Sequence, residues 1–216
     1  MPADSRADLQ TEIAATAARM IAEEGLDYAS AKRKAAEELT GGIDQRALPD
    51  NPSVERELRR YLGTFDPDHP ARLAALRSQA LVLMDRLAPF NPHLVGAVLN
   101  GTATAHSNLH LHLFTDSAKD VELFLMDARI DFEVDEPAGR RGEPGAAMEE
   151  LSFVVPVREP TLAPRLGVVL SVHPTDAIRV APRGRSADPE LHPVETSGRA
   201  ARAALQTLVD AARGPA

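Results

Sequence analysis

Apolar residues recur at helical spacing over the first third of the chain. In residues 8–24, Ile13, Ala17 and Ile21 fall on one face, and Gly25 follows the last turn, where a helix commonly stops. The same spacing predicts three further helices, over residues 31–39, 52–63 and 70–88. The front of the chain is therefore predicted to be entirely helical.

After residue 90 the pattern changes to short apolar runs and to strict alternation. Asn108–Phe114 alternates polar and apolar residues, as a half-buried strand does, and the apolar run Leu94–Asn100 predicts a buried strand before it. Three more strands are predicted over Arg129–Val134, Leu151–Val157 and Leu166–Val172, and two helices over 117–128 and 198–212. We therefore expect an α/β (α+β) fold with a mixed sheet of about five strands.

Length, composition and charge limit the domain organisation and the partners of the protein. The 216 residues are 44% hydrophobic, enough for one sizeable core, and we divide them into a helical N-terminal region over 1–69 and an α/β domain over 70–216. The net charge of −8 argues against broad nucleic-acid binding, which depends on neutralising phosphates. The absence of cysteine excludes disulfides and thiolate metal sites. No apolar run reaches the ~18 residues of a membrane span, so we expect a cytoplasmic protein without a membrane partner.

The segment from Leu99 to Phe114 carries the most specific chemical signal. Gly101 and Thr102 follow an apolar run, and Ser107 and Asn108 open the alternating strand. Backbone N–H groups and a hydroxyl at a tight turn are suited to holding a triphosphate. Side chains at period-two spacing project from one face of a strand. The pattern predicts a phosphate-binding corner beside a polar strand face.

Three segments in this order carry a resemblance to a known family. They read Val98-Leu99-Asn100-Gly101-Thr102, then Ser107-Asn108-Leu109-His110-Leu111, then Arg129-Ile130-Asp131-Phe132-Glu133-Val134. The pattern resembles the minimal, MNT-type nucleotidyltransferases of the polymerase-beta superfamily, over about residues 73–135. In that family a strand ending in Gly-Ser precedes a strand reading Ser-Asp-Ile-Asp-Leu, and a later strand supplies a third acid. The resemblance implies a nucleotide or phosphorylated small molecule held by Gly101, Thr102 and Ser107, with Mg²⁺ or Mn²⁺ accompanying a nucleoside triphosphate.

The sequence departs from the family where the metal ions bind. Asn108 and His110 stand in place of the paired aspartates, and only Asp131 keeps an acid. Asparagine is a neutral ligand, and histidine prefers softer metals than Mg²⁺. The resemblance therefore implies a divergent, catalytically impaired member. If it is an active nucleotidyltransferase, Asp131 holds the remaining metal while Asn108 and His110 orient the phosphates.

His110 and His112 are expected on the same face of one strand as Asn108. Three interpretations of the two histidines stay open. They are ligands of a metal such as Zn²⁺, with His106, Asp116 or Asp131 completing the set. Alternatively, their imidazoles contact the phosphates in place of Mg²⁺. The third interpretation is a polar strand face with no ligand.

The front helices suggest a more distant alternative. The segment 13–26 is similar to the first helix of TetR-type repressors, and Lys32, Arg33 and Lys34 lie on the next predicted helix. The following segment, Ile43–Pro49, is too short for a recognition helix, which argues against DNA binding. We favour a helical cap on the α/β domain.

A non-catalytic module that binds a protein partner remains the main alternative to nucleotide binding. Arg140 and Arg141, in a loop rich in Gly and Pro, are candidate phosphate clamps. The sequence contains no P-loop and no Gly-x-Ser-x-Gly elbow.

Overall fold

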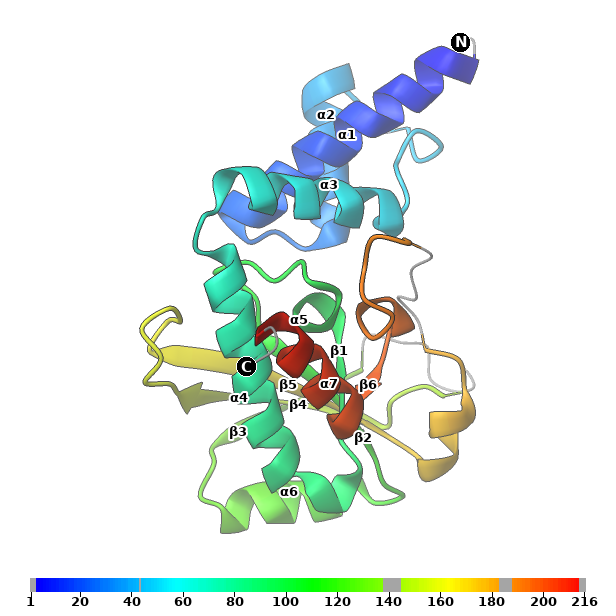
Figure 1. Cartoon of the computed structure of the whole chain (residues 1–216). Coiled ribbons are helices and arrows are strands. Elements are labelled where there is room, and N and C mark those ends of the chain that lie inside the picture. Colours follow the sequence, from blue (N-terminus) through cyan, green and yellow to red (C-terminus); the bar gives the residue numbers. More distant parts are fainter. Residues whose placement is uncertain (1–2, 43, 138–144, 183–187, 214–216) are drawn as a thin grey trace. The chain divides into compact units, whose positions relative to one another are not determined.

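The computed structural model describes residues 3–42, 44–137, 145–182 and 188–213 (Figure 1). Its contacts divide the chain into two compact units. The first unit contains Met1–Pro70 and the short segment Thr102–His106. The second contains Ala71–Gly101 and Ser107–Ala216. We describe each unit by itself.

Three helices form the first unit: α1 (Ala3–Glu24), α2 (Tyr28–Thr40) and α3 (Asn51–Phe65). The helices predicted from the apolar spacing are thus confirmed, with boundaries shifted by a few residues. The carboxylates of Asp27 and Asp50 accept hydrogen bonds from backbone N–H groups at the starts of α2 and α3. The core between the helices is closed by fully buried side chains, among them Ile13, Met20, Leu58 and Leu62.

The segment Thr102–His106 packs within the helical unit, although the sequence assigned it to the α/β domain. Thr102 is only 1% exposed, and its side chain is hydrogen-bonded to the phenol of Tyr28. Burial raises the pKa of Tyr28 to about 12. The hydroxyl predicted to contact phosphate is therefore engaged within the protein.

The second unit is built on a mixed sheet of six strands in the order β3-β4-β5-β2-β1-β6. The strands are β1 (His93–Val95), β2 (Leu109–Phe114), β3 (Phe132–Asp135), β4 (Glu149–Pro156), β5 (Arg165–His173) and β6 (Ala200–Ala201). The helices are α4 (His69–Arg86), α5 (Gly96–Asn100), α6 (Ala118–Asp127) and α7 (Arg202–Arg213), with three short 3-10 turns, η1 (Ala88–Phe90), η2 (Thr175–Arg179) and η3 (Glu195–Ser197). Only β2 and β5 pair in parallel; the other neighbours are antiparallel. The predicted α+β class with a mixed sheet is confirmed.

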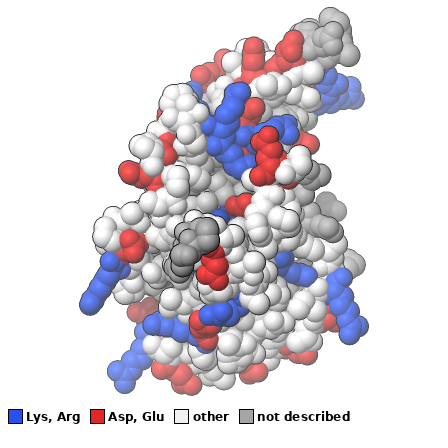
Figure 2. All heavy atoms as spheres, viewed as in Figure 1, with Lys and Arg blue, Asp and Glu red and all other residues white. Residues whose placement is uncertain are grey.

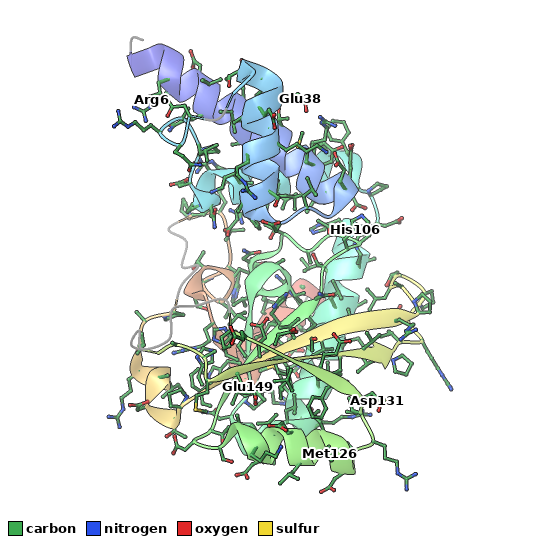
Figure 3. The ribbon with its side chains drawn as sticks, turned by 180° about the vertical axis from the view of Figure 1, so that it is seen from behind. Arg6, Glu38, His106, Met126, Asp131 and Glu149 are labelled. Carbon is green, nitrogen blue, oxygen red and sulfur yellow. The ribbon has the colours of Figure 1, made fainter. Side chains whose placement is uncertain are left out.

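The two faces of the sheet differ as the alternation in β2 predicts. Leu109, Leu111 and Leu113 are fully buried on the face that α4 and α7 cover in Figure 1. His110 and His112 lie on the opposite face, which Figure 3 shows from behind with the strands in front of α4. The chemistry of this unit is therefore concentrated on the polar face.

Two predicted strands were wrong in part, and one short strand was missed. The run Leu94–Asn100 is a strand only to Val95, because Gly96 turns the backbone at φ 71° and the remaining residues form α5. A short apolar run fits a buried helical turn as well as a strand, so the pattern was ambiguous. The strand predicted over Arg129–Val134 begins only at Phe132, and β6 was not predicted because it has two residues.

Candidate functional site

A large hollow lies at one end of the sheet in the second unit. Its volume is about 930 Å³, within the range of small-molecule sites. Asn108 of β2 and Asp131, just before β3, both line it, as do Gly167 of β5 and Val154 of β4. It therefore brings two of the sequence-predicted residues to one cavity.

Asn108 and Asp131 nevertheless do not converge on one ion. Leu109 of β2 pairs with Val168 of β5, so the residues before them, Asn108 and Gly167, lie side by side. Gly167 in turn pairs with Val154 of β4. Asp131 precedes Phe132, which pairs with Phe153, and so continues the same row on the far side of β4. Three strand spacings separate the two backbones, roughly 14 Å. Figure 3 shows Asp131 at the end of the sheet opposite Glu149.

The lining of the hollow is locally basic although the chain as a whole is acidic. Arg86, Arg129 and Arg165 line it, against the two carboxylates of Asp131 and Glu133. Among the residues that the structure describes, no carboxylate forms an ion pair with any of these arginines. Guanidinium groups without a protein partner are suited to binding phosphate or carboxylate groups of a ligand.

Gly167 fixes the position of Asn108. A Cβ atom at residue 167 would lie 2.2 Å from Oδ1 and 2.9 Å from Cγ of Asn108, so the Asn108 side chain lies directly over the glycine. An isolated glycine inside a predicted strand commonly marks such a close approach. Gly167 was within the predicted strand Leu166–Val172, and this signal was available in the sequence.

We predict that Gly167→Ala moves the Asn108 side chain while leaving stability almost unchanged. The clash is with the end of one exposed side chain, which rotates away, so the free energy of unfolding should change by less than about 1 kcal/mol. A crystal structure of the variant should show a new Asn108 rotamer. In a chain that already carries Asn108→Ala, Gly167→Ala should no longer change the free energy of unfolding. An unchanged Asn108 rotamer in the Gly167→Ala variant would contradict the prediction.

The Gly101 corner, by contrast, is filled by protein. Gly101 ends α5 with φ 81°, and a Cβ atom there would lie 3.4 Å from Glu195 Oε1. Arg77 donates from Nε to the carbonyl of Val98 (3.1 Å) and from Nη2 to that of Leu99 (3.0 Å). Its Nη2 also pairs with Glu195 Oε1 at 2.6 Å. Neither Gly101 nor Ser107 lines the hollow, so the predicted phosphate corner and the hollow are separate places.

Four of the seven histidines lie on the polar face of the sheet: His93, His110, His112 and His173. The rings of His112 and His173 are tilted by 43° to each other with centroids 4.3 Å apart, and the ring of Phe114 is stacked on that of His173 and lies edge-on to that of His112. Arg199 lies over the ring of Phe114 at 5.0 Å. His110 and His112 are thus part of a packed histidine cluster, which we define as these four histidines.

Burial keeps the histidine cluster neutral. It lowers the pKa of His112 to about 3; the proton that His173 can take up and the positive charge of Arg199 act in the same direction. Burial also lowers the pKa of His93 and of His173, opposed by hydrogen bonds to the carbonyls of Asn91 and Gly145. For His110 the same effect of burial is opposed by the carboxylate of Glu150.

The donor set does not fit the metal site that the family resemblance implies. In the part of the chain that the structure describes, no three His, Asp or Glu side chains are placed to hold one ion. Asn108 is a neutral ligand, Asp131 is three strand spacings away, and the ring of His112 packs against those of Phe114 and His173. We therefore derive no metal-dependent step for this chain. Asp116, another candidate ligand, instead accepts hydrogen bonds from the backbone N–H and hydroxyl of Thr175.

Of the two groups of basic residues singled out in the sequence, the one on α2 does not line the hollow. Lys32 donates to Pro49 O and Asn51 Oδ1, and Lys34 pairs with Glu24, so these side chains hold the helical unit together. Arg140 and Arg141 lie outside the described residues.

Comparisons with protein-family models, with curated proteins and with solved structures found no match to this chain. Fold and site therefore define the class: an α+β protein with a mixed six-stranded sheet, a three-helix unit and a hollow at the sheet end. None of the described helices is both long enough and apolar enough to cross a bilayer.

The sequence missed Arg86, Arg165 and Gly167 as residues of the site. Arg86 lies near the end of the helix predicted over 70–88 and Arg165 directly precedes the strand predicted from Leu166, positions at which an arginine carries no signal of its own. Only the tertiary arrangement of α4 and the strands brings these residues to one cavity.

Proposed function

We propose that the protein binds a phosphorylated small molecule of nucleotide size in the hollow at the end of the sheet. The observation that supports the proposal is the combination of three arginines, each without an ion-pair partner among the described residues, with Asn108 around a volume of about 930 Å³. Arginines bind the phosphates through paired N–H donors, while the amide of Asn108 donates to or accepts from a neutral part of the ligand. Apolar side chains of β3 and β4, among them Phe132 and Val154, offer surface to a base or sugar.

The proposal differs from the sequence-based expectation in the position of the phosphates. The resemblance placed them at Gly101 and Thr102, whereas Arg86, Arg129 and Arg165, which have no ion-pair partner among the described residues, line a hollow that neither Gly101 nor Thr102 lines. Binding is proposed without nucleotidyl transfer, because among the described residues no three His, Asp or Glu side chains are placed to hold a metal ion.

A small anionic ligand suits this surface better than a nucleic acid. In the view of Figure 2, basic and acidic side chains are interspersed rather than gathered in one basic tract. With a net charge of −8, the chain lacks the excess of cations that non-specific phosphate-backbone binding requires. A confined cluster of arginines is enough for a single phosphorylated molecule.

Charge reversal in the hollow is the direct test. We expect ATP, CTP, GTP or UTP to bind to the full chain in isothermal titration calorimetry, and the corresponding nucleoside to bind far more weakly. The double variant Arg86→Glu/Arg165→Glu should weaken nucleotide binding roughly 100-fold, because two attractive contacts become repulsive. The titrations are run with and without Mg²⁺.

Arg179→Glu is the matched control, since Arg179 is an exposed arginine of the same unit that does not line the hollow. Its affinity should remain within about twofold of the original chain. If no nucleotide binds at millimolar concentration, or if Arg179→Glu weakens binding as much as the double variant, the proposal is wrong. The first result would favour the protein-interaction alternative.

A further inference from the structure

The end of α6 has an unusual residue at its capping position. The N–H of Ile130 donates to the carbonyl of Leu125, and the N–H of Arg129 to that of Met126, both at 2.9 Å. This pair of bonds defines a Schellman motif, in which the residue at the position of Arg129 takes a left-handed backbone conformation. Arg129 has φ 56°, as the motif requires.

Glycine is the common residue at this position because a Cβ atom disfavours positive φ. In the described part of the chain, Asn91 and Arg129 are the two residues other than glycine with positive φ. Asparagine tolerates this conformation, whereas arginine gains nothing from it locally. The cap would therefore be more stable with glycine, and the arginine needs another explanation.

The position of Arg129 supplies that explanation. Arg129 lines the hollow together with Arg86 and Arg165, and its guanidinium has no ion-pair partner among the described residues. Strained backbone at a ligand site commonly serves to place a side chain for binding. The geometry of the motif fixes the backbone of Arg129 through two hydrogen bonds, so the side chain starts from a rigid base.

We propose that Arg129 is a phosphate-binding residue of the hollow, held in an unfavourable backbone conformation for that purpose. The inference rests on the proposed function and adds to it a specific residue and the ligand group that this residue recognises. Arg129 contributes a bidentate contact to the phosphate group from the α6 side, while Arg165 contributes from the start of β5.

The experiment separates binding from stability in one substitution. Arg129→Gly should raise Tm by about 2–4 °C, because glycine relieves the backbone conformation, and should weaken the binding of ATP tenfold or more. Arg129→Asn keeps a side chain that tolerates positive φ but carries no charge, and it should weaken ATP binding to a similar degree. Both are measured on the full chain, by thermal denaturation and by calorimetric titration.

Asn91→Gly is the matched control. It relieves the other positive φ, at an exposed position outside the hollow, and should leave the affinity for ATP unchanged. If ATP binds to the original chain and to Arg129→Gly equally well while Arg86→Glu/Arg165→Glu binds weakly, the role of Arg129 is refuted and the proposed function stands. If ATP and the other nucleotides do not bind to the original chain at all, both proposals fall. Weakened binding with an unchanged or lower Tm would refute the strained conformation.

Discussion

Replacing Arg77 by alanine should lower the free energy of unfolding by about 3–5 kcal/mol. Arg77 is only 5% exposed, and its guanidinium donates to two backbone carbonyls at the end of α5 and to Glu195. Alanine would leave the carboxylate of Glu195 with no cation beside it, and the carbonyls of Val98 and Leu99 without these donors. The loss is measured by urea denaturation followed by far-UV circular dichroism.

An exposed ion pair of the same unit provides the comparison. Arg202 pairs with Asp85, with side chains 47% and 55% exposed, so Arg202→Ala should lower the free energy of unfolding far less than Arg77→Ala does. Glu195→Gln should fall between the two, because glutamine still accepts a hydrogen bond from Arg77. Equal losses for Arg77→Ala and Arg202→Ala would show that burial does not set the strength of the Arg77 interactions.

Acidification should destabilise the fold through the histidine cluster. A free histidine has a pKa near 6.5, whereas burial lowers that of His112 to about 3 in the folded chain. Below pH 6.5 the unfolded chain therefore binds a proton that the folded chain does not, and stability falls as the pH falls. His112 alone should cost about 2 kcal/mol by pH 5, and the lowered pKa values of His93, His110 and His173 add in the same direction.

The measurement is a series of urea denaturations from pH 7.5 to pH 5. The series stops there because burial raises the pKa of Glu55 and of Glu149, and at lower pH their protonation opposes the trend. His112→Leu should reduce the slope between pH 6.5 and 5 by up to about 1.4 kcal/mol per pH unit. The control is His106→Gln, at an exposed position in the helical unit. Stability that stays constant over this range would contradict the burial of neutral histidines.

The alternation in Asn108–Phe114 predicted both the strand and its two faces, because a period of two is a property of any strand half buried in a core. The leucines of β2 are buried, and the histidines face the other side. The amphipathic spacing of apolar residues predicted the helices of the first unit in the same way. In these elements local pattern and tertiary structure agree.

The positions of the site residues depend on which strands are neighbours in the sheet, and the hydrophobic pattern of the sequence does not contain that information. Asp131 was expected beside His110, but β4 and β5 lie between β3 and β2 in the sheet. No local signal in the sequence tells which strands are neighbours. Arg77 did leave a signal, since it follows Leu73 by four residues and precedes Ala80 by three within the apolar stripe of a predicted helix. An arginine on such a stripe indicates buried acceptors.

The assignment of Thr102–His106 to the helical unit has a consequence for dissecting the molecule. The chain passes between the two units three times, after residues 70, 101 and 106. A single cut therefore cannot release either unit intact. A fragment ending at residue 70 would keep Tyr28 but lack Thr102, its hydroxyl partner, and one starting at 71 would carry five residues separated from the helices they pack against. We expect the two halves to be recovered as folded species only when they are produced together.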